Sequence, residues 1–330
     1  MSIKPVALTL GEPAGIGGEI SLKAWHGLRT ELPFFLLADV THMTTLAQQD
    51  HTPVVAITSP HEAAEAMSAG LPVLDHPLPA PVTTGKPDAR NAAEVVAMIA
   101  RAVEYAQNGE ACAVTTNPIH KKALQDGAGF AFPGHTEFLA SLADVKRPVM
   151  MLSAPELRVV PVTIHIPLAD VPAALTAGLL EETLRVTHAA LIDDLGIPEP
   201  RIAVAGLNPH AGEGGAMGHE EITLITPLLE RLRNEGMTLL GPLPADTMFH
   251  ASAREAYDLA VCMYHDQALI PIKTLNFSAG VNTTLGLPFV RTSPDHGTAF
   301  DIAGKGIADA TSLIEALRNA RAMAIHRGFA

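Results

Sequence analysis

The sequence predicts an α/β fold made of two α/β/α domains, each built on a mostly parallel sheet. Short runs rich in β-branched residues alternate with segments of helical spacing, which is typical of parallel strands joined by helices. Aromatic residues make up only 4% of the 330 residues and hydrophobic residues 48%, so the core is expected to consist of Ala, Val, Ile and Leu. The number of expected strands exceeds what one small domain holds, and the length allows two domains with cores of their own.

The expected elements follow one another along the whole chain. Strands are predicted at 6–10, 34–39, 54–57, 111–116, 149–153, 158–165, 201–207 and 258–264. Apolar residues at helical spacing predict helices at 88–108, 169–177, 180–195, 219–235 and 309–326. Gly109 stands where a helix C-cap is expected. Because no Pro- or Ser-rich linker marks a boundary, the chain is expected to leave the first domain and later return to it.

Composition excludes several classes of protein. The net charge of −13 argues against a nucleic-acid-binding surface. No apolar stretch approaches the length of a membrane helix, and the apolar run at the N-terminus is too short for a signal peptide. Cys112 and Cys262 each lie in an apolar run and are expected to be buried and reduced. A cytoplasmic location without nucleic-acid or membrane partners is therefore expected.

Three histidines occur where expected strands end. His165 ends the run 158–165, His210 follows 201–207 closely, and His265 directly follows 258–264. Ligand sites in open α/β sheets lie at the carboxyl ends of strands, and three neutral imidazoles suit Zn²⁺ or a similar divalent ion. The chain has 15 histidines, however, and these spacings match no short metal motif. A chance placement therefore stays open at this point.

Other polar residues near turns suggest a site for an anion. Two segments of glycine-rich or turn-forming residues, 208–215 and 133–137, each lead into an expected helix. The second segment carries His135 and Thr136. The chain has few basic groups, so those close to turns are candidates for a phosphate or carboxylate. The candidates outside these two turns are Lys273, Asn282 and Arg291. The alternatives are ordinary loops, an N-cap role for Thr136 and solvated surface side chains.

The first glycine-rich turn, 11–18, is a poor match to a nucleotide-binding motif. Asp39 stands at the end of the next expected strand, where a dinucleotide-binding fold carries an acidic residue. Ile20 nevertheless occupies the place of the third glycine, and no phosphate-loop lysine follows. A tight strand-to-helix turn is the favoured interpretation. Serine-hydrolase and zinc-protease motifs are absent from the sequence.

Several longer motifs resemble one enzyme family. In chain order they are GEPAGIG, PGHTEF, LNPHAGEGG, PLPADT, YHDQ and NTTLGLPFVRTSPDHGTAFDIAGKG. Together they resemble the 4-hydroxythreonine-4-phosphate dehydrogenases of pyridoxal phosphate synthesis, over essentially the whole chain. The resemblance implies NAD-linked oxidation of the 3-hydroxyl of 4-phosphooxy-L-threonine, followed by loss of CO₂ to give 3-amino-2-oxopropyl phosphate.

The resemblance also implies a set of site residues. The metal ligands would be His165, His210 and His265, for Zn²⁺, Mg²⁺ or Co²⁺. The enzyme would be a homodimer with its active site at the interface, and we expect His265 to come from the other chain. The substrate contacts would be His135, Thr136, Lys273, Asn282 and Arg291. Lys273 and Asp246 are both candidates for the general base.

The segment from Asp295 to Asp309 resembles the cofactor loop of isocitrate and isopropylmalate dehydrogenases. This implies their two-domain fold, with the adenosine half of NAD on His296, Gly297 and Asp301. NAD is expected in preference to NADP, because a carboxylate repels a 2′-phosphate. The first domain would then comprise 1–130 and about 275–330. The second would comprise about 131–274 and carry the metal ligands and dimer interface.

Three other functions stay open on sequence grounds. A relative acting on 4-phosphoerythronate or 4-phosphothreonate would share most of these motifs. An acyltransferase of similar two-domain fold is disfavoured by the three histidines and the cofactor-like loop. A non-catalytic phosphate-binding module has no need of a metal site.

Overall fold

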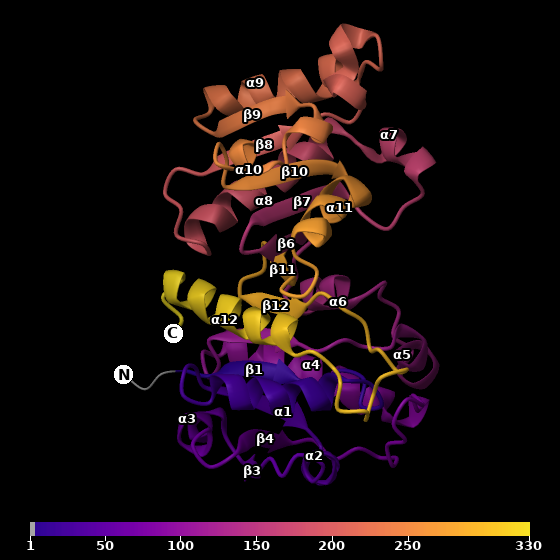
Figure 1. Ribbon diagram of the computed structural model, residues 1–330, viewed down its shortest axis with the longest axis vertical. Coiled ribbons are helices and arrows are strands. Elements are labelled where there is room, and N and C mark those ends of the chain that lie inside the picture. Colours follow the sequence, from indigo (N-terminus) through magenta and orange to yellow (C-terminus); the bar gives the residue numbers. More distant parts are fainter. Residues whose placement is uncertain (1–3) are drawn as a thin grey trace. The chain divides into compact units, whose positions relative to one another are not determined.

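The computed structural model describes residues 4–330 and divides the chain into two compact units. Unit 1 comprises Met1–Pro148 and Leu287–Ala330, and unit 2 comprises Val149–Gly286 (Figure 1). Each unit has a sheet with helices packed on it, so the expected α/β fold is confirmed.

The boundaries lie at 148 and 286 rather than near 130 and 275. Two local contacts explain the difference. Helix α6 (His135–Leu142) packs on α4 (Ala92–Gln107), and this keeps residues 131–148 with unit 1. Strand β11 (Val281–Leu285) pairs with β6 (Val149–Ala154), and this keeps residues 275–286 with unit 2.

Unit 1 has a parallel sheet with the strand order β3-β4-β2-β1-β5-β12. Its strands are β1 (Val6–Thr9), β2 (Phe34–Ala38), β3 (Val54–Ile57), β4 (Leu71–Asp75), β5 (Ala113–Thr116) and β12 (Arg291–Pro294). Most residues of these strands are buried, as expected where helices cover both faces of a sheet.

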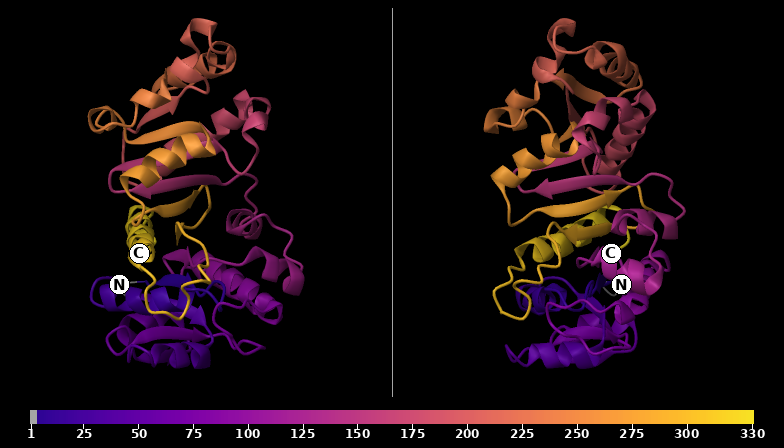
Figure 2. Two further views of the ribbon diagram at one scale, coloured as in Figure 1. Left: turned by 45° about the vertical axis from the view of Figure 1, so that its right-hand side comes forward. Right: turned by 90° about the vertical axis from the view of Figure 1, so that its right-hand side faces the viewer.

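The helices of unit 1 cover both faces of this sheet (Figure 2). On one face, α1 (Gly17–Leu28) packs against α2 (Val40–Ala47) and α12 (Thr311–His326). Helix α4 covers β1 and β5 from the other face and contacts α5 (Lys121–Ala128). A short helix, α3 (Ala63–Ala66), joins β3 to β4.

Unit 2 has the strand order β11-β6-β7-β10-β8-β9. Strands β7, β10, β8 and β9 are parallel, whereas β6 is antiparallel to both of its neighbours. The strands not yet defined are β7 (Leu157–Thr163), β8 (Arg201–Ala205), β9 (Thr238–Leu243) and β10 (Leu259–Tyr264). Neighbouring parallel strands therefore place their carboxyl ends along one edge of the sheet.

Alternate residues of these strands enter two separate cores. Val160, Val204 and Val261 pack with α8 (Ala177–Asp193) and α9 (Thr226–Asn234). Their strand neighbours, such as Val159, Ala203 and Cys262, pack on the opposite face, which α11 (His265–Leu275) covers (Figure 2). This is the period of two expected for a strand that is buried on both faces. Two short helices, α7 (Val171–Ala174) and α10 (Ala251–Arg254), complete the unit.

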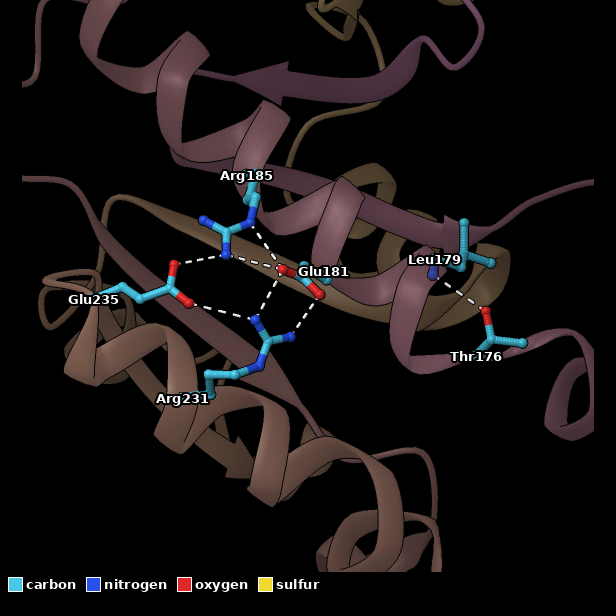
Figure 3. A network of polar contacts seen from close by, with 6 residues as sticks. All are labelled: Thr176, Leu179, Glu181, Arg185, Arg231 and Glu235. Carbon is cyan, nitrogen blue, oxygen red and sulfur yellow. Dashed lines mark hydrogen bonds and ion pairs between the residues drawn. The ribbon is translucent and has the colours of Figure 1, made fainter.

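An exposed network of ion pairs joins α8 to the end of α9 (Figure 3). Arg185 donates to Glu181 on its own helix and to Glu235 beyond α9, while Arg231 reaches the same two carboxylates. These hydrogen bonds lower the pKa of Glu181 to about 2. The two helices also share the apolar core. The exposed network links them at the surface, and its contribution to stability is small compared with that of burial.

The sequence located most of these elements to within a few residues. It did not assign β4, β9, β11, β12, α2, α3, α5, α10 or α11. Four of these lack a strong signal, because β9 contains Pro242, β12 contains Pro294, α11 contains Pro271 and three of the five residues of β11 are asparagine or threonine. The prediction for the cysteines is confirmed, since Cys112 and Cys262 are both buried and free.

No helix formed by residues 4–330 has the length and apolar character that a membrane crossing requires.

The packing of α9 gives a testable expectation for stability. Leu229 is fully buried in the core between α8, α9 and the sheet. Leu229→Ala is expected to lower the free energy of unfolding by about 2–5 kcal/mol, because it removes buried methyl groups and leaves a cavity. Urea denaturation followed by circular dichroism measures this change. Glu230→Ala, at the exposed next position, is the control and should change stability by less than about 0.5 kcal/mol. Equal effects of the two substitutions would contradict the assigned core.

Candidate functional site

Two of the three predicted metal ligands lie side by side in unit 2. His165 follows β7 and His265 follows β10, and these neighbouring parallel strands end at the same edge. The two imidazole rings lie 5.7 Å apart between centroids, at an interplanar angle of 42°. The topology thus brings together residues that are 100 positions apart in the sequence.

A cavity of about 250 Å³ lies at this edge, within unit 2. Both histidines line it, together with Thr163, Ile164, Ile166, Leu168, Val171, Tyr264 and Asp266. The Nδ1 atom of His265 is 2.7 Å from Oδ1 of Asp266. When Nδ1–H donates to this carboxylate, the lone pair of Nε2 is left for a ligand, which is the usual arrangement of a metal-binding histidine.

The third predicted ligand, His210, belongs to the loop after β8, the strand on the other side of β10. A buried carboxylate shapes this loop. Glu221 accepts hydrogen bonds from the backbone N–H of Asn208 (2.8 Å) and from its side-chain amide (3.0 Å). A Cβ on Gly212 would lie 2.6 Å from the same carboxylate, so the loop folds tightly around Glu221.

The backbone of two of these histidines is strained. His165 has φ +34° and His210 has φ +51°, both in the left-handed region. Residues 210–214 are all left-handed. For a residue other than glycine this costs about 1–3 kcal/mol, and such strain concentrates at functional sites.

The residues fit a divalent ion, but one chain does not assemble the whole set. Within residues 4–330, no group of three or more His, Cys, Asp or Glu side chains is close enough together to hold a metal. The pair His165 and His265 is suitable by chemistry, by its adjacency and by the bond from His265 to Asp266. His210 does not join this pair in the single chain.

A second group of predicted residues lies in unit 1 around Arg291. This arginine is 3% exposed, and its Nη2 donates to Oγ1 of Thr116 at the end of β5 (2.7 Å). His135 begins α6 close enough for the charge of Arg291 to act on it. Thr136 and Glu137 follow in the first turn of the same helix. The negative charge of Glu137 acts on the guanidinium of Arg291.

The electrostatics around Arg291 and His135 favour an anion. Burial lowers the pKa of Arg291 to about 10, against the opposing effect of Glu137. Burial also lowers the pKa of His135 well below its usual range, and the charges of Arg291 and Lys121 lower it further. The Nε2 atom of His135 is buried and has no hydrogen-bond partner. A neutral imidazole beside two cations can serve as a hydrogen-bond donor to an incoming acceptor.

The remaining predicted substrate residues lie in unit 2. Lys273 lies in α11, with its Nζ 5.5 Å from the centroid of the Phe277 ring. Asn282 lies in β11, and its side-chain oxygen is buried without a hydrogen-bond partner. Asp246 is exposed in a short 3₁₀ turn, Ala245–Thr247, which packs against the loop of His210. The two candidates for the general base thus lie on different elements, and Asp246 belongs with the His210 loop.

The predicted cofactor loop follows β12 in unit 1. Nδ1 of His296 lies 3.0 Å from the carbonyl oxygen of Gly297, while its Nε2 is buried and has no partner. Asp301 is exposed, and no atom lies within 4 Å of the position that a Cβ on Gly297 would take. These features fit the adenosine half of NAD, since they leave a carboxylate, a ring nitrogen and open backbone for it.

The turn at 11–18 has a packing role, as its poor motif match suggested. A Cβ on Gly11 would lie 2.4 Å from the carbonyl oxygen of Pro118, and one on Gly17 would lie 2.2 Å from that of Leu10. Asp39 is equally occupied: its two oxygens accept hydrogen bonds from the backbone N–H groups of His42 and Leu78. Neither feature is available to a dinucleotide.

Comparison with known proteins identifies the family. Residues 30–320 match the family model described as pyridoxal phosphate biosynthetic protein PdxA. A 4-hydroxythreonine-4-phosphate dehydrogenase of Roseobacter denitrificans is 58% identical over 321 residues, which cover 97% of each chain. The chain belongs to the PdxA family.

Solved structures agree with this assignment to PdxA. A 4-hydroxythreonine-4-phosphate dehydrogenase from Klebsiella pneumoniae superimposes with a TM-score of 0.88 at 38% identity, covering 98% of both chains. A terephthalate 1,2-cis-dihydrodiol dehydrogenase from Burkholderia xenovorans has a TM-score of 0.67 at 29% identity, covering 97% of this chain and 98% of that one. Proteins named for different substrates therefore share this fold.

Sequence reasoning assigned no role to several residues around the candidate site. Thr116, Lys121 and Glu137 surround the pair of Arg291 and His135. The signal for Thr116 was present, because a buried apolar strand ends there in two threonines. Asp266 was also missed, although it directly follows a predicted ligand. Its role depends on side-chain direction, which the sequence does not give.

The pocket predicts the titration of His135. Its imidazole should stay neutral to lower pH than an ordinary histidine, because burial and two positive charges disfavour protonation. Arg291→Met and Lys121→Met should each raise its pKa, and burial should still hold it below the usual value. NMR titration of the histidine ring Cε1–H signals measures this. Arg318→Met removes an arginine that pairs with Glu31 and Glu315, and it is the control that should leave His135 unchanged. A normal pKa in the unsubstituted protein would contradict the pocket.

Proposed function

We propose that this protein catalyses the NAD-linked, metal-dependent oxidation and decarboxylation of 4-phosphooxy-L-threonine. The products would be 3-amino-2-oxopropyl phosphate, CO₂ and NADH, within pyridoxine 5′-phosphate biosynthesis. The names of relatives up to 58% identical support this activity, and membership of the PdxA family agrees with it.

The observation that carries the proposal is the buried Arg291 beside His135. Arg291 is a buried guanidinium beside a neutral histidine, in a chain with a net charge of −13 and few basic groups. Arg291 is suited to bind the phosphate or carboxylate of a small substrate. His135 and Thr136 would add neutral donors, and Lys273 and Asn282 are the other proposed substrate-binding residues.

The proposed metal ligands are His165, His210 and His265. A divalent ion held there, Zn²⁺, Mg²⁺ or Co²⁺, supplies a Lewis acid that eases deprotonation of the hydroxyl and stabilises the charge formed on decarboxylation. By accepting Nδ1–H, Asp266 would fix the ring and tautomer of His265. The exposed hydrophobic walls of the cavity, Ile166 and Leu168, help to exclude water once they are covered. Lys273 and Asp246 stay the candidates for the general base.

A second candidate function is oxidation of another phosphorylated hydroxy acid, 4-phosphoerythronate or 4-phosphothreonate. It is favoured by the 29% identical dehydrogenase named for an unrelated diol, since it indicates that this fold accepts different hydroxyl substrates. Arg291 and the metal ligands would serve all of these substrates alike. Direct comparison of the substrates is therefore the deciding experiment.

Turnover of the three phosphorylated substrates with NAD tests the proposal. NADH absorbance should rise with 4-phosphooxy-L-threonine, and kcat/KM for it should exceed the values for the other two. EDTA should abolish turnover, and re-addition of Zn²⁺, Mg²⁺ or Co²⁺ should restore it. A higher kcat/KM for 4-phosphoerythronate or 4-phosphothreonate would favour the second candidate. Activity that survives complete metal removal would refute the metal-dependent mechanism.

We further propose a homodimer whose active site takes residues from both chains. Large exposed hydrophobic residues follow each proposed ligand: Ile166 and Leu168 after His165, Met217 and Ile222 after His210, and Ile270, Leu275 and Phe277 after His265. Leu168 is 69% exposed and Phe277 78%. Exposed apolar surface of this kind is typical of a protein interface.

Mixing of inactive variants tests the shared site. His165→Ala, His210→Ala and His265→Ala are each expected to be inactive, and each pair is mixed after subunit exchange. About half of the dimers are then mixed. If the two substituted ligands of a site come from different chains, one site of each mixed dimer is intact. About a quarter of the activity and bound metal of the unsubstituted protein should then return. The pair from one chain should stay inactive.

The pair that fails to recover identifies the ligands that share a chain. Failure of the His165 and His210 pair would support our expectation from sequence. Failure of the His165 and His265 pair would instead agree with the contact of these rings within one chain. No recovery in any mixture, with subunit exchange confirmed by mass spectrometry, would overturn the shared site.

A further inference from the structure

A buried carboxylate and a lysine tie the loop 295–310 to helix α1. Glu19 is 6% exposed, and its two oxygens accept hydrogen bonds from the backbone N–H groups of Gly304 and Ala308, each at 3.2 Å. Lys23 donates to the carbonyl oxygens of Gly306 (2.9 Å) and Ala308 (2.6 Å). One face of one helix thus satisfies backbone groups at three positions of the loop.

Interactions within α1 also stabilise the positions of Glu19 and Lys23. Glu19 and Lys23 are four residues apart, so they lie on the same face of α1, and their charged atoms are 3.4 Å apart. Glu19 lies in the first turn, where the helix dipole favours a negative charge. A carboxylate this deeply buried is costly without donors. The two N–H groups of the loop therefore stabilise the buried carboxylate, and the carboxylate in turn holds the loop in place.

The conformation of the loop matches these contacts. Gly304 and Gly306 both have φ +72°, a left-handed conformation that glycine adopts without strain. This turns the N–H of Gly304 and the carbonyl of Gly306 towards α1. A residue with a side chain at 304 would also press against Thr84, 2.9 Å from the position of its Cβ.

The start of the loop is held by the glycine-rich turn before α1. Ile16 donates its backbone N–H to the carbonyl oxygen of Thr298 (3.1 Å), and a Cβ on Gly15 would lie 2.8 Å from that oxygen. Phe300 is held by an edge-on contact with His120, at 5.2 Å between ring centroids. The exposed Asp301 therefore lies on a segment fixed on both sides, between Thr298 and Gly304.

We propose that Glu19 and Lys23 are positioning residues for NAD. They hold the backbone of the loop so that His296, Gly297 and Asp301 are already in place before the cofactor arrives. The inference rests on the proposed function, which assigns this loop to NAD. A loop ordered in advance loses less conformational entropy on binding, so the contribution of Glu19 and Lys23 should be seen in NAD affinity.

The test compares Glu19→Gln with the unsubstituted protein. The amide keeps the shape of the side chain but replaces one acceptor oxygen with an NH₂ group, which cannot accept from a backbone N–H. In NAD-free protein, amide hydrogen exchange of residues 297–309 should become faster. Calorimetry should show NAD binding weakened about tenfold, the effect of one lost charge-assisted hydrogen bond. The KM for NAD should rise similarly, with kcat at saturating NAD and the KM for the phosphorylated substrate unchanged.

Two further variants and one control complete the design. Lys23→Met removes the donor to Gly306 and Ala308 and should act in the same direction, which covers a failure of Glu19→Gln to fold. Glu31→Gln is the matched control, because it makes the same chemical change at an exposed pair with Arg318 and should alter neither exchange nor NAD affinity. Asp301→Ala tests the assignment of the loop to NAD independently of the two positioning residues.

The outcomes separate the two proposals. Unchanged amide hydrogen exchange of the loop in both Glu19→Gln and Lys23→Met overturns the positioning role. An equal loss of affinity for NAD and for the substrate, together with a lowered melting temperature, also overturns it. Weaker NAD binding in Asp301→Ala but not in the two positioning variants also overturns it and leaves the cofactor loop standing. Unchanged NAD binding in all three variants refutes the cofactor assignment within the proposed function.

Discussion

Parallel pairing of neighbouring strands is the constraint on which the candidate sites of both units depend. In unit 2, β7, β10 and β8 are adjacent and parallel, so His165, His265 and His210 leave the sheet at one edge. In unit 1, β1, β5 and β12 are likewise adjacent and parallel. The turn after β1 therefore contacts the loop after β12, where the backbone N–H of Ile16 donates to the carbonyl oxygen of Thr298. Residues far apart in sequence become neighbours because the strands before them are neighbours.

Buried charges then fix the loops that leave these strand ends. Glu19 holds the loop after β12, and Glu221 holds the loop of His210. Arg291 joins the beginning of β12 to Thr116 at the end of β5. All three are at most 6% exposed. A charge in such a place is stable only with its donors or acceptors in position, so each one permits few loop conformations. Loops that would otherwise be mobile thereby acquire the order that a binding site requires.

The sequence predicted the fold class, most strands and the edge of the sheet at which His165 and His265 meet, because hydrophobic periodicity and strand ends are local properties. It did not predict contacts that depend on the direction of a side chain. Asp266 beside His265 and Glu19 beside the loop 295–310 are both of this kind, and an acidic residue in a first helical turn looks the same whether it is exposed or buried. The expected domain boundaries also depended on such contacts, since α6 and β11 are assigned to a unit only by what they pack against.

The proposed dimer would account for both the incomplete ligand set and the exposed apolar residues of unit 2. Within residues 4–330 the structure gathers two imidazoles and leaves the third apart, while its strained loop holds His210 in an exposed, left-handed conformation. Large apolar side chains follow all three histidines and lie open to water. Burial of those side chains against a second copy of the chain would stabilise the pair by the hydrophobic effect. The same contact would bring proposed ligands of two chains together. Association and completion of a metal site would then be one event, because the residues that drive association lie within twelve positions after the proposed ligands.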